Sequence, residues 1–100
     1  RRRPDPLRPA VSELRDDPAR GRFEMNEQGL TSHVDYRRGV GRLFIDYVYA
    51  PPPLRGSGAA GRLMTAVAER ARAEGLKVTP ICGYAASWLN ASKTYRDLVR

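Results

Sequence analysis

The sequence has few of the residues that cross-link chains or bind metals. It contains one cysteine, Cys82, and one histidine, His33, in 100 residues. A single cysteine excludes an internal disulfide, and with one histidine it argues against a zinc site built from protein ligands alone. We therefore expect no metal, and a reducing compartment such as the cytoplasm suits the chain.

Long apolar runs are also missing. No stretch of about 18 consecutive apolar residues occurs, so we expect no membrane-spanning segment. The opening residues, RRRPDPLRPA, have no apolar core and do not resemble a secretory signal. With 100 residues and 41% apolar content, the chain has room for one small domain with one modest core.

Positive charge is present in excess. The formal net charge is +7, which favours contact with a polyanion. The charge is spread along the chain, because residues 1–22 contribute +3 and residues 23–100 contribute +4. A nucleic-acid-binding domain is therefore kept only as an alternative, since a small phosphate-bearing ligand would use the same positive potential.

The residue pattern predicts an α/β domain over residues 21–100 behind a basic arm. Residues 1–20 are expected to form this flexible arm, with a short helical turn capped by Ser12 and ended before Pro18. Three strands with short links then predict an antiparallel βββ meander, in the segments RFEMNEQG, LTSHVDYRRGVG and RLFIDYVYA. Residues 51–53 are all proline and end the third strand, because proline cannot donate to a ladder.

The clearest helix follows the prolines and ends at Gly75. Its apolar residues recur at helical spacing: Ala60, Leu63, Met64, Val67, Ala68 and Ala71. LKVTPIC is expected to be a buried strand, and the strand–helix–strand unit a right-handed βαβ crossover. The last segment, YAASWLNASKTYRDLVR, predicts one helix broken near residues 90–92 or two short helices, with Trp88 and Leu89 packed onto the sheet.

The glycine-rich stretch before this helix matches one of three phosphate-binding motifs better than the other two. Residues 56–61 form a GxGxxG, but they do not directly follow a strand, and the acid that dinucleotide binding requires about 20 residues on is missing. A P-loop needs Lys and Ser or Thr where Arg62 and Leu63 stand. From Arg55 onward the stretch is R-x-x-G-x-A opening into a helix, whose amides and dipole suit a pyrophosphate. An ordinary glycine-rich turn is the alternative.

This R-x-x-G-x-A pattern resembles the acyl-CoA signature of the GCN5-related N-acetyltransferase (GNAT) superfamily. From about Arg22 to Val99 the chain is similar to its small subfamily named for a Cys-Gly-type motif, through RFEM, APPPLRGSGAAGRLM, GLKVTPICGYAASWL and YRDLV. The resemblance implies a truncated GNAT fold, acetyl-CoA as cosubstrate and transfer to a small-molecule or peptidyl amine. Candidate cofactor-binding residues are Val48, Tyr49, Arg55, Gly56, Ser57, Gly58, Ala59, Ala60 and Asn90.

Cys82 is the first candidate for the chemistry. If its strand runs parallel to the third strand, Cys82 lies at the same sheet edge as the glycine loop. Pro80 lacks an N–H, so strand pairing should weaken just before Cys82 and admit a thioester arm. Cys82 is then expected to accept the acetyl group or to act as acid or base, unless it is merely a small buried residue. Tyr84 could protonate the leaving thiolate or simply pack.

The general base is harder to assign. The subfamily pattern would place a histidine and an acid where this sequence has Tyr47 and Tyr49. Asp46 is the only carboxylate of that strand, and burial would raise its pKa and suit it to the role. A solvent-facing or ion-paired Asp46 is the alternative. His33 is interpreted as a solvated strand residue.

The sequence therefore predicts an N-acetyltransferase. A CoA-binding sensor without turnover is one alternative, favoured by Tyr47 and Tyr49, and a basic nucleic-acid-binding domain is another. We expect no membrane partner. The chain is expected to be a monomer or a homodimer, because the edge strands of a short sheet can pair with a second copy.

Overall fold

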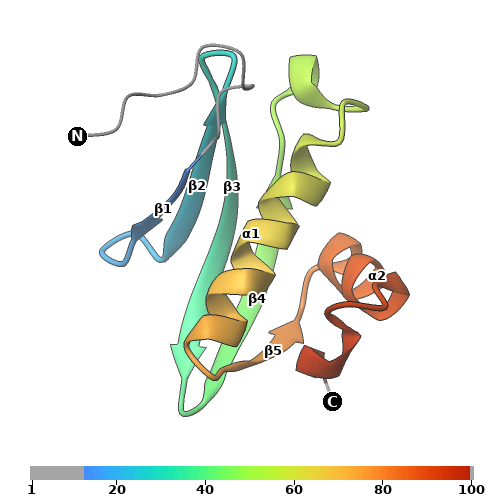
Figure 1. Ribbon diagram of the computed structural model, residues 1–100. Coiled ribbons are helices and arrows are strands. Elements are labelled where there is room, and N and C mark those ends of the chain that lie inside the picture. Colours follow the sequence, from blue (N-terminus) through green and yellow to red (C-terminus); the bar gives the residue numbers. More distant parts are fainter. Residues whose placement is uncertain (1–12, 100) are drawn as a thin grey trace, which may run out of the picture.

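The computed structural model describes residues 13–99 (Figure 1). One sheet holds five strands in the order β1-β2-β3-β4-β5. Their bounds are β1 Leu14–Asp17, β2 Arg22–Glu27, β3 Leu30–Gly39, β4 Arg42–Tyr49 and β5 Lys77–Pro80. The helices are α1 Ala59–Ala73 and α2 Gly83–Ala91, with short 3-10 helices η1 Pro52–Leu54 and η2 Arg96–Val99. No helix in the described range is long and apolar enough to cross a membrane.

The strand pairing confirms the predicted fold class. Strands β2, β3 and β4 form the antiparallel meander, and β5 runs parallel to β4 after α1 has crossed over. The last segment forms two short helices, α2 and η2, as one of the two predicted versions had it. Figure 1 shows α1 lying along one face of the sheet, with α2 beyond the β5 edge.

The predicted helical turn before Pro18 is wrong. Residues 14–17 form strand β1, which pairs with β2, so this part of the predicted flexible arm belongs to the sheet. The cross-strand partners explain the difference: the Tyr36 hydroxyl donates to the Asp16 carboxylate, and Arg15 forms an ion pair with Glu24 at 3.3 Å. Such tertiary contacts outweigh a weak local helix preference. Residues 1–12, including Ser12, lie outside the described residues.

The core lies between α1 and the sheet. Its fully buried members come from α1 and from four strands: Phe23, Val34, Leu43, Ile45, Leu63, Met64, Val67 and Val78. The buried stripe of α1 begins at Ala59 and not at the predicted Ala60, which is half-buried. Gly75 ends α1 with a positive φ of 70°, as predicted. Strand β5 is buried only at Val78 and Ile81 is exposed, because β5 is an edge strand and not the predicted buried one.

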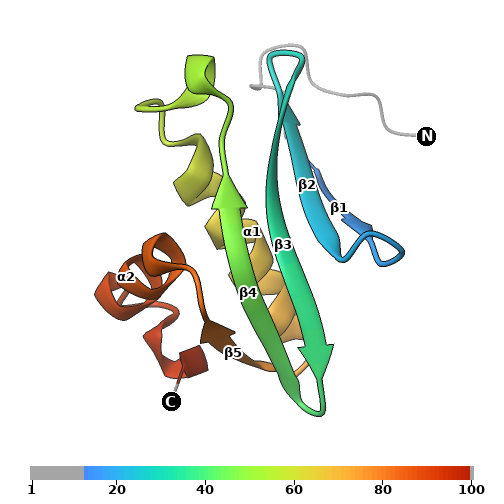
Figure 2. The same ribbon diagram turned by 180° about the vertical axis from the view of Figure 1, so that it is seen from behind.

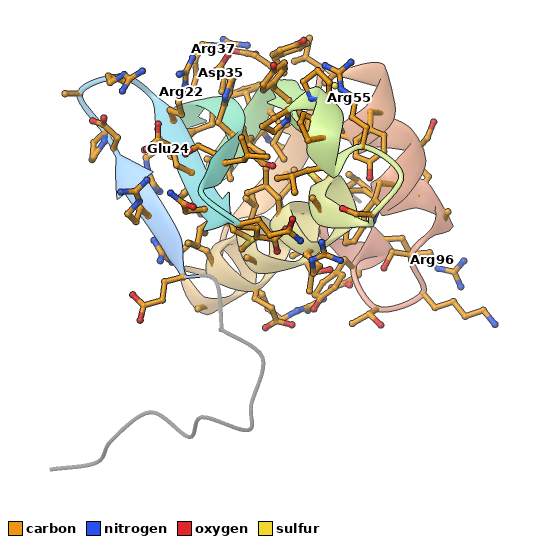
Figure 3. The ribbon with its side chains drawn as sticks, turned by 90° about the horizontal axis from the view of Figure 1, so that it is seen from above. Arg22, Glu24, Asp35, Arg37, Arg55 and Arg96 are labelled. Carbon is orange, nitrogen blue, oxygen red and sulfur yellow. The ribbon has the colours of Figure 1, made fainter. Side chains whose placement is uncertain are left out.

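The opposite face of the sheet is not covered by a helix over β2, β3 and β4, among the residues that the structure describes (Figure 2). Its side chains alternate with the core residues along each strand. Figure 3 shows Arg22, Asp35 and Arg37 on this side, away from α1. We call it the open face, and it carries Arg22, Glu24, His33, Asp35, Arg37 and Phe44.

Candidate functional site

Strands β4 and β5 separate where the site begins. Their paired register runs from Arg42 with Lys77 to Ile45 with Pro80. The amides of Ile81 and Cys82 then both donate to the Ile45 carbonyl, at 2.8 and 3.1 Å, and the chain turns into α2. Strand β4 continues to Tyr49 without a β5 partner. The strands therefore part after Cys82 and leave an unpaired edge along the end of β4.

A β-bulge lies at the same level of β4. Tyr36 pairs with Ile45 and Asp35 with Tyr47, so Asp46 is the extra residue of β4. The extra residue reverses the alternation of side chains. Val48 consequently shares a face with its core partner Val34, whereas Tyr47 and Tyr49 turn to the open face.

The glycine loop connects β4 with α1 through η1. Leu54 is buried and anchors the loop, and its carbonyl accepts both the amide and the hydroxyl of Ser57. Gly56 and Gly58 have φ values of 81° and 89°, a region that side chains disfavour. The Arg55 Nε donates to the Ala50 carbonyl at 2.8 Å, and its guanidinium lies 5.5 Å from the Tyr49 ring centroid. Hydrogen bonds to backbone carbonyls thus fix the loop, and its glycines allow the positive φ values that its shape requires.

The loop delivers a helix N-terminus to a pocket. Gly58 is the N-cap of α1, and its carbonyl accepts the Arg62 amide at 3.0 Å. The amides of residues 59–61 precede that bond and have no partner within the helix. No acidic residue occupies the first turn. These residues line a pocket of about 320 Å³, whose members are Ala50, Leu54, Arg55, Gly56, Gly58, Ala59, Ala60, Gly61 and Tyr84.

Arg62 braces this loop from the side, a role that the sequence did not reveal. Its Nη1 donates to the Ser57 carbonyl at 2.9 Å, and its Nε and Nη2 donate to Glu27 at 2.9 and 3.0 Å. The hydrogen bond with Glu27 raises the pKa of Arg62. Gly61 is another addition, because it lies in the helix as predicted but also lines the pocket.

Cys82 and Tyr84 lie at the same sheet edge as the loop. Cys82 is the half-buried N-cap of α2, and its sulfur makes no cap hydrogen bond. Tyr84, 44% exposed, lines the pocket. Burial, and secondarily a charge at Cys82, raise the pKa of the Tyr84 hydroxyl, so it stays protonated at neutral pH. The structure thus brings together the glycine loop, Tyr84 and Cys82, while their chemical roles stay predictions.

The expected rise in the Asp46 pKa is wrong. Arg37 donates to both carboxylate oxygens of Asp46 at 2.8 Å, and this hydrogen bonding lowers the pKa of Asp46. The physical reason is the alternation along β4: Ile45 faces the core, so Asp46 faces the open side of the sheet beside Arg37 of β3. An ion-paired carboxylate with a lowered pKa is a poor general base, so the alternative interpretation of Asp46 holds.

The remaining predicted residues divide into two groups. Val48 and Tyr49 end β4 and lead into the loop, with both side chains half-buried. Asn90 lies exposed on α2, where its Nδ2 donates to the Ala86 carbonyl at 2.8 Å. It does not line the pocket. The structure therefore brings Tyr49 to the glycine loop but leaves Asn90 away from it.

His33 is not the solvated residue that the sequence suggested. Its side chain is 17% exposed and stacks on Tyr49 with ring centroids 5.2 Å apart. Tyr47 lies 6.3 Å from it, measured between ring centroids. Burial, followed by the charge of Arg22, lowers the pKa of His33 below its usual 6.5. Within residues 13–99, no three His, Cys, Asp or Glu side chains gather where they could hold a metal.

Comparison with known proteins agrees with this geometry. The family model described as GCN5-related N-acetyl-transferase matches residues 22–98. Among solved structures, the chain is similar to an NMR structure of a GCN5-like candidate N-acetyltransferase from Staphylococcus aureus, with a TM-score of 0.63 and 24% identity. The similarity covers 86% of this chain and 85% of the other, and it supports the fold alone. No curated protein sequence gives a significant match.

Proposed function

This chain belongs to the GCN5-related N-acetyltransferase family, and we propose on that premise that it binds acetyl-CoA and transfers the acetyl group to an amine. The observation that carries the proposal is the position of the glycine loop. The loop opens a 15-residue helix at the edge of the sheet where β4 runs on beyond its parallel partner β5. Ligands of α/β proteins bind at such an edge, and anions bind at such helix ends. We place the reaction in the cytoplasm, where a free thiol such as Cys82 stays reduced.

The proposed binding mode uses backbone more than side chains. The amides of residues 59–61 would hold the pyrophosphate, with Arg55 beside them. Gly56 and Gly58 place no Cβ between the loop backbone and the phosphate oxygens. The thioester arm would then follow the unpaired edge of β4 toward Cys82 and Tyr84, because hydrogen-bonding groups are free there.

The proposed chemistry is attack by a neutral amine on the thioester carbon. The C–N bond forms, the C–S bond breaks, and the CoA sulfur leaves as a thiolate that needs a proton. Tyr84 is the candidate for this donation, because it lines the pocket and a tyrosine hydroxyl carries its proton at neutral pH. Cys82 is a second candidate, as a nucleophile that accepts the acetyl group before the amine does.

Acetyl-CoA binding is the first experiment. We expect acetyl-CoA to raise the melting temperature, since a ligand at 100 times its Kd stabilises a fold by about 2.7 kcal/mol. Ala60→Asp is the informative variant, because a carboxylate in the first turn favours the helix but repels a pyrophosphate. Thr65→Asp, on the exposed surface of the same helix, is the matched control. Ala60→Asp should fold normally and lose the ligand-induced shift, and no shift in the parent protein would defeat the proposal.

A sensor that binds acetyl-CoA without turnover is the second candidate. It is favoured by Tyr47 and Tyr49 on β4 and by the ion pair that occupies Asp46. Release of CoA thiol in the presence of a panel of amines separates the two functions. Binding without release would favour the sensor, and absence of binding would leave the basic nucleic-acid-binding domain as the remaining alternative.

A further inference from the structure

Three rings on the open face form a cluster at the end of β4. His33 comes from β3, and Tyr47 and Tyr49 come from β4 beyond the bulge. The ring centroids of His33 and Tyr49 are 5.2 Å apart, and those of Tyr47 and Tyr49 are 6.5 Å apart. Tyr47 is 50% exposed, so the cluster is open to solvent on one side. We call these three residues the His33 cluster.

The position of the cluster relates it to the separation of the strands. His33 pairs directly with Tyr49, the last residue of β4. The opposite edge of β4 is the one that β5 leaves after Ile45. The imidazole and the proposed path of the thioester arm therefore lie on the two sides of one strand. Neighbouring strands are about 4.8 Å apart, so a side chain on β3 can reach an amine held over β4 directly or through one water.

The charges around His33 favour its neutral form. Charged and aromatic groups from every adjoining element surround the His33 imidazole. They are Arg20, Arg22, Glu24, Asp35, Tyr47, Tyr49 and, over the Tyr49 ring, Arg55. The Asp35 Oδ1 lies 3.9 Å from the His33 Nε2, too far for a hydrogen bond, and accepts the Arg22 Nε at 2.9 Å. Burial and Arg22 keep the pKa of His33 below 6.5. At neutral pH the imidazole is thus uncharged and can accept a proton.

Resting on the proposed acetyl transfer, we propose that the acceptor is an alkylamine that approaches from the open face over the His33 cluster, and that His33 removes its proton. An alkylammonium has no lone pair and cannot attack a thioester until it loses a proton. The carboxylate of Asp46 on β4 already accepts two hydrogen bonds from Arg37. His33 is the neutral base that the open face offers at the end of β4.

The proton balance is simple. The alkylammonium gives one proton to His33 and becomes the nucleophile, the C–N bond forms and the C–S bond breaks. The nitrogen then loses a second proton, which balances the one that the CoA thiolate gains from Tyr84 or from solvent. His33 finally releases its proton to solvent. One ammonium and one thioester thus give one amide, one thiol and one proton.

The single histidine allows a direct test that does not depend on the acceptor. In the full chain, the Cε1–H resonance of His33 can be followed by NMR against pH, alone and with saturating CoA or acetyl-CoA. We expect an apparent pKa below 6.5 and a resonance that moves more with acetyl-CoA than with CoA. Binding of acetyl-CoA without any change at His33 would overturn this proposal alone. No binding at all would overturn the proposed function and this proposal with it.

Kinetics then test the base role. The probes are butylamine, which is protonated at pH 7, and aniline, which is already neutral there. His33→Gln should lower kcat/KM for butylamine about 100-fold and remove the acidic limb of its pH profile, with little effect on KM for acetyl-CoA. Transfer to aniline should be almost unchanged, and Asn26→Gln, at an exposed position of β2, is the matched control. An equal loss with both amines would show that His33 only supports the fold and would overturn its role as base.

Discussion

The guanidinium of Arg62 joins the glycine loop to the β2–β3 hairpin through Glu27. It contacts both Glu27 carboxylate oxygens, at 2.9 and 3.0 Å, and the Ser57 carbonyl at 2.9 Å. Gly58 makes room for this side chain, because a Cβ there would lie 3.0 Å from the Arg62 Nη1. The loop is therefore fixed from outside the helix, and its shape depends on residues 35 positions apart.

Replacing Arg62 should weaken ligand binding more than folding. We expect Arg62→Gln to lower acetyl-CoA affinity roughly tenfold, because an unbraced loop must be ordered at the moment of binding. Its effect on stability should be small, since exposed ion pairs contribute little. Arg72→Gln is the control, because Arg72 also donates two hydrogen bonds to a carboxylate, that of Asp97, near the other end of α1. Titration calorimetry measures the acetyl-CoA affinity of both variants. Equal affinities of Arg62→Gln and Arg72→Gln would contradict the bracing role.

Gly61→Ala should separate stability from binding. Gly61 lies in the first turn of α1 and lines the pocket, and a Cβ there would meet the Trp88 Nε1 at an ordinary 3.6 Å. Alanine favours a helix over glycine by about 1 kcal/mol, so the melting temperature should rise by about 4–8 °C. The added methyl group enters the pocket, so acetyl-CoA affinity should fall. Thr65→Ala, one turn along and outside the pocket, should leave affinity unchanged.

The glycine loop and the crossover could be predicted because local signals determine them. Residues 51–53 end a strand, glycines at 56 and 58 adopt positive φ, and the apolar spacing of α1 needs no knowledge of its partners. Pairing does end near Cys82, but the expected cause was wrong: the amides of Lys77 and Ile81 donate toward β4, so the nitrogen of Pro80 faces away from it. The loop, unlike this edge, thus follows from properties of single residues.

The rest of the site depends on register, which the sequence does not display. The bulge at Asp46 reverses the faces of Tyr47 and Tyr49, and the pairing of Arg37 with Phe44 brings Arg37 close to Asp46. His33 meets Tyr49 only because β3 and β4 pair in that register. Strand β1 was missed for a related reason, because its partners Tyr36 and Glu24 lie far along the chain. A shift of one residue would turn each of these side chains to the other face.

Cys82→Ser should raise stability while testing the chemistry. Cys82 is the N-cap of α2 without a cap hydrogen bond, and serine at an N-cap stabilises a helix by about 1 kcal/mol. If the thiol accepts the acetyl group, turnover should fall by at least 100-fold, because a hydroxyl is a far weaker nucleophile. The parent protein mixed with acetyl-CoA should then carry an acetyl group on Cys82 in mass spectra. Unchanged turnover in Cys82→Ala and Cys82→Ser would exclude the covalent role.

Stability should also depend on pH through His33. The pKa of His33 is lowered in the fold from 6.5, so the unfolded chain binds the proton first as the pH falls. The contribution of neutral His33 is therefore intact above pH 6.5 and is lost progressively as the pH falls from 6.5 to the folded-state pKa. The pKa values of Asp46 and Asp97 are lowered from 3.8, so these residues change the stability only at a more acidic pH. Urea unfolding at about pH 7.5 and about pH 5 should show lower stability at the acidic value. His33→Gln should reduce that difference, and an unchanged difference would mean that another group causes it.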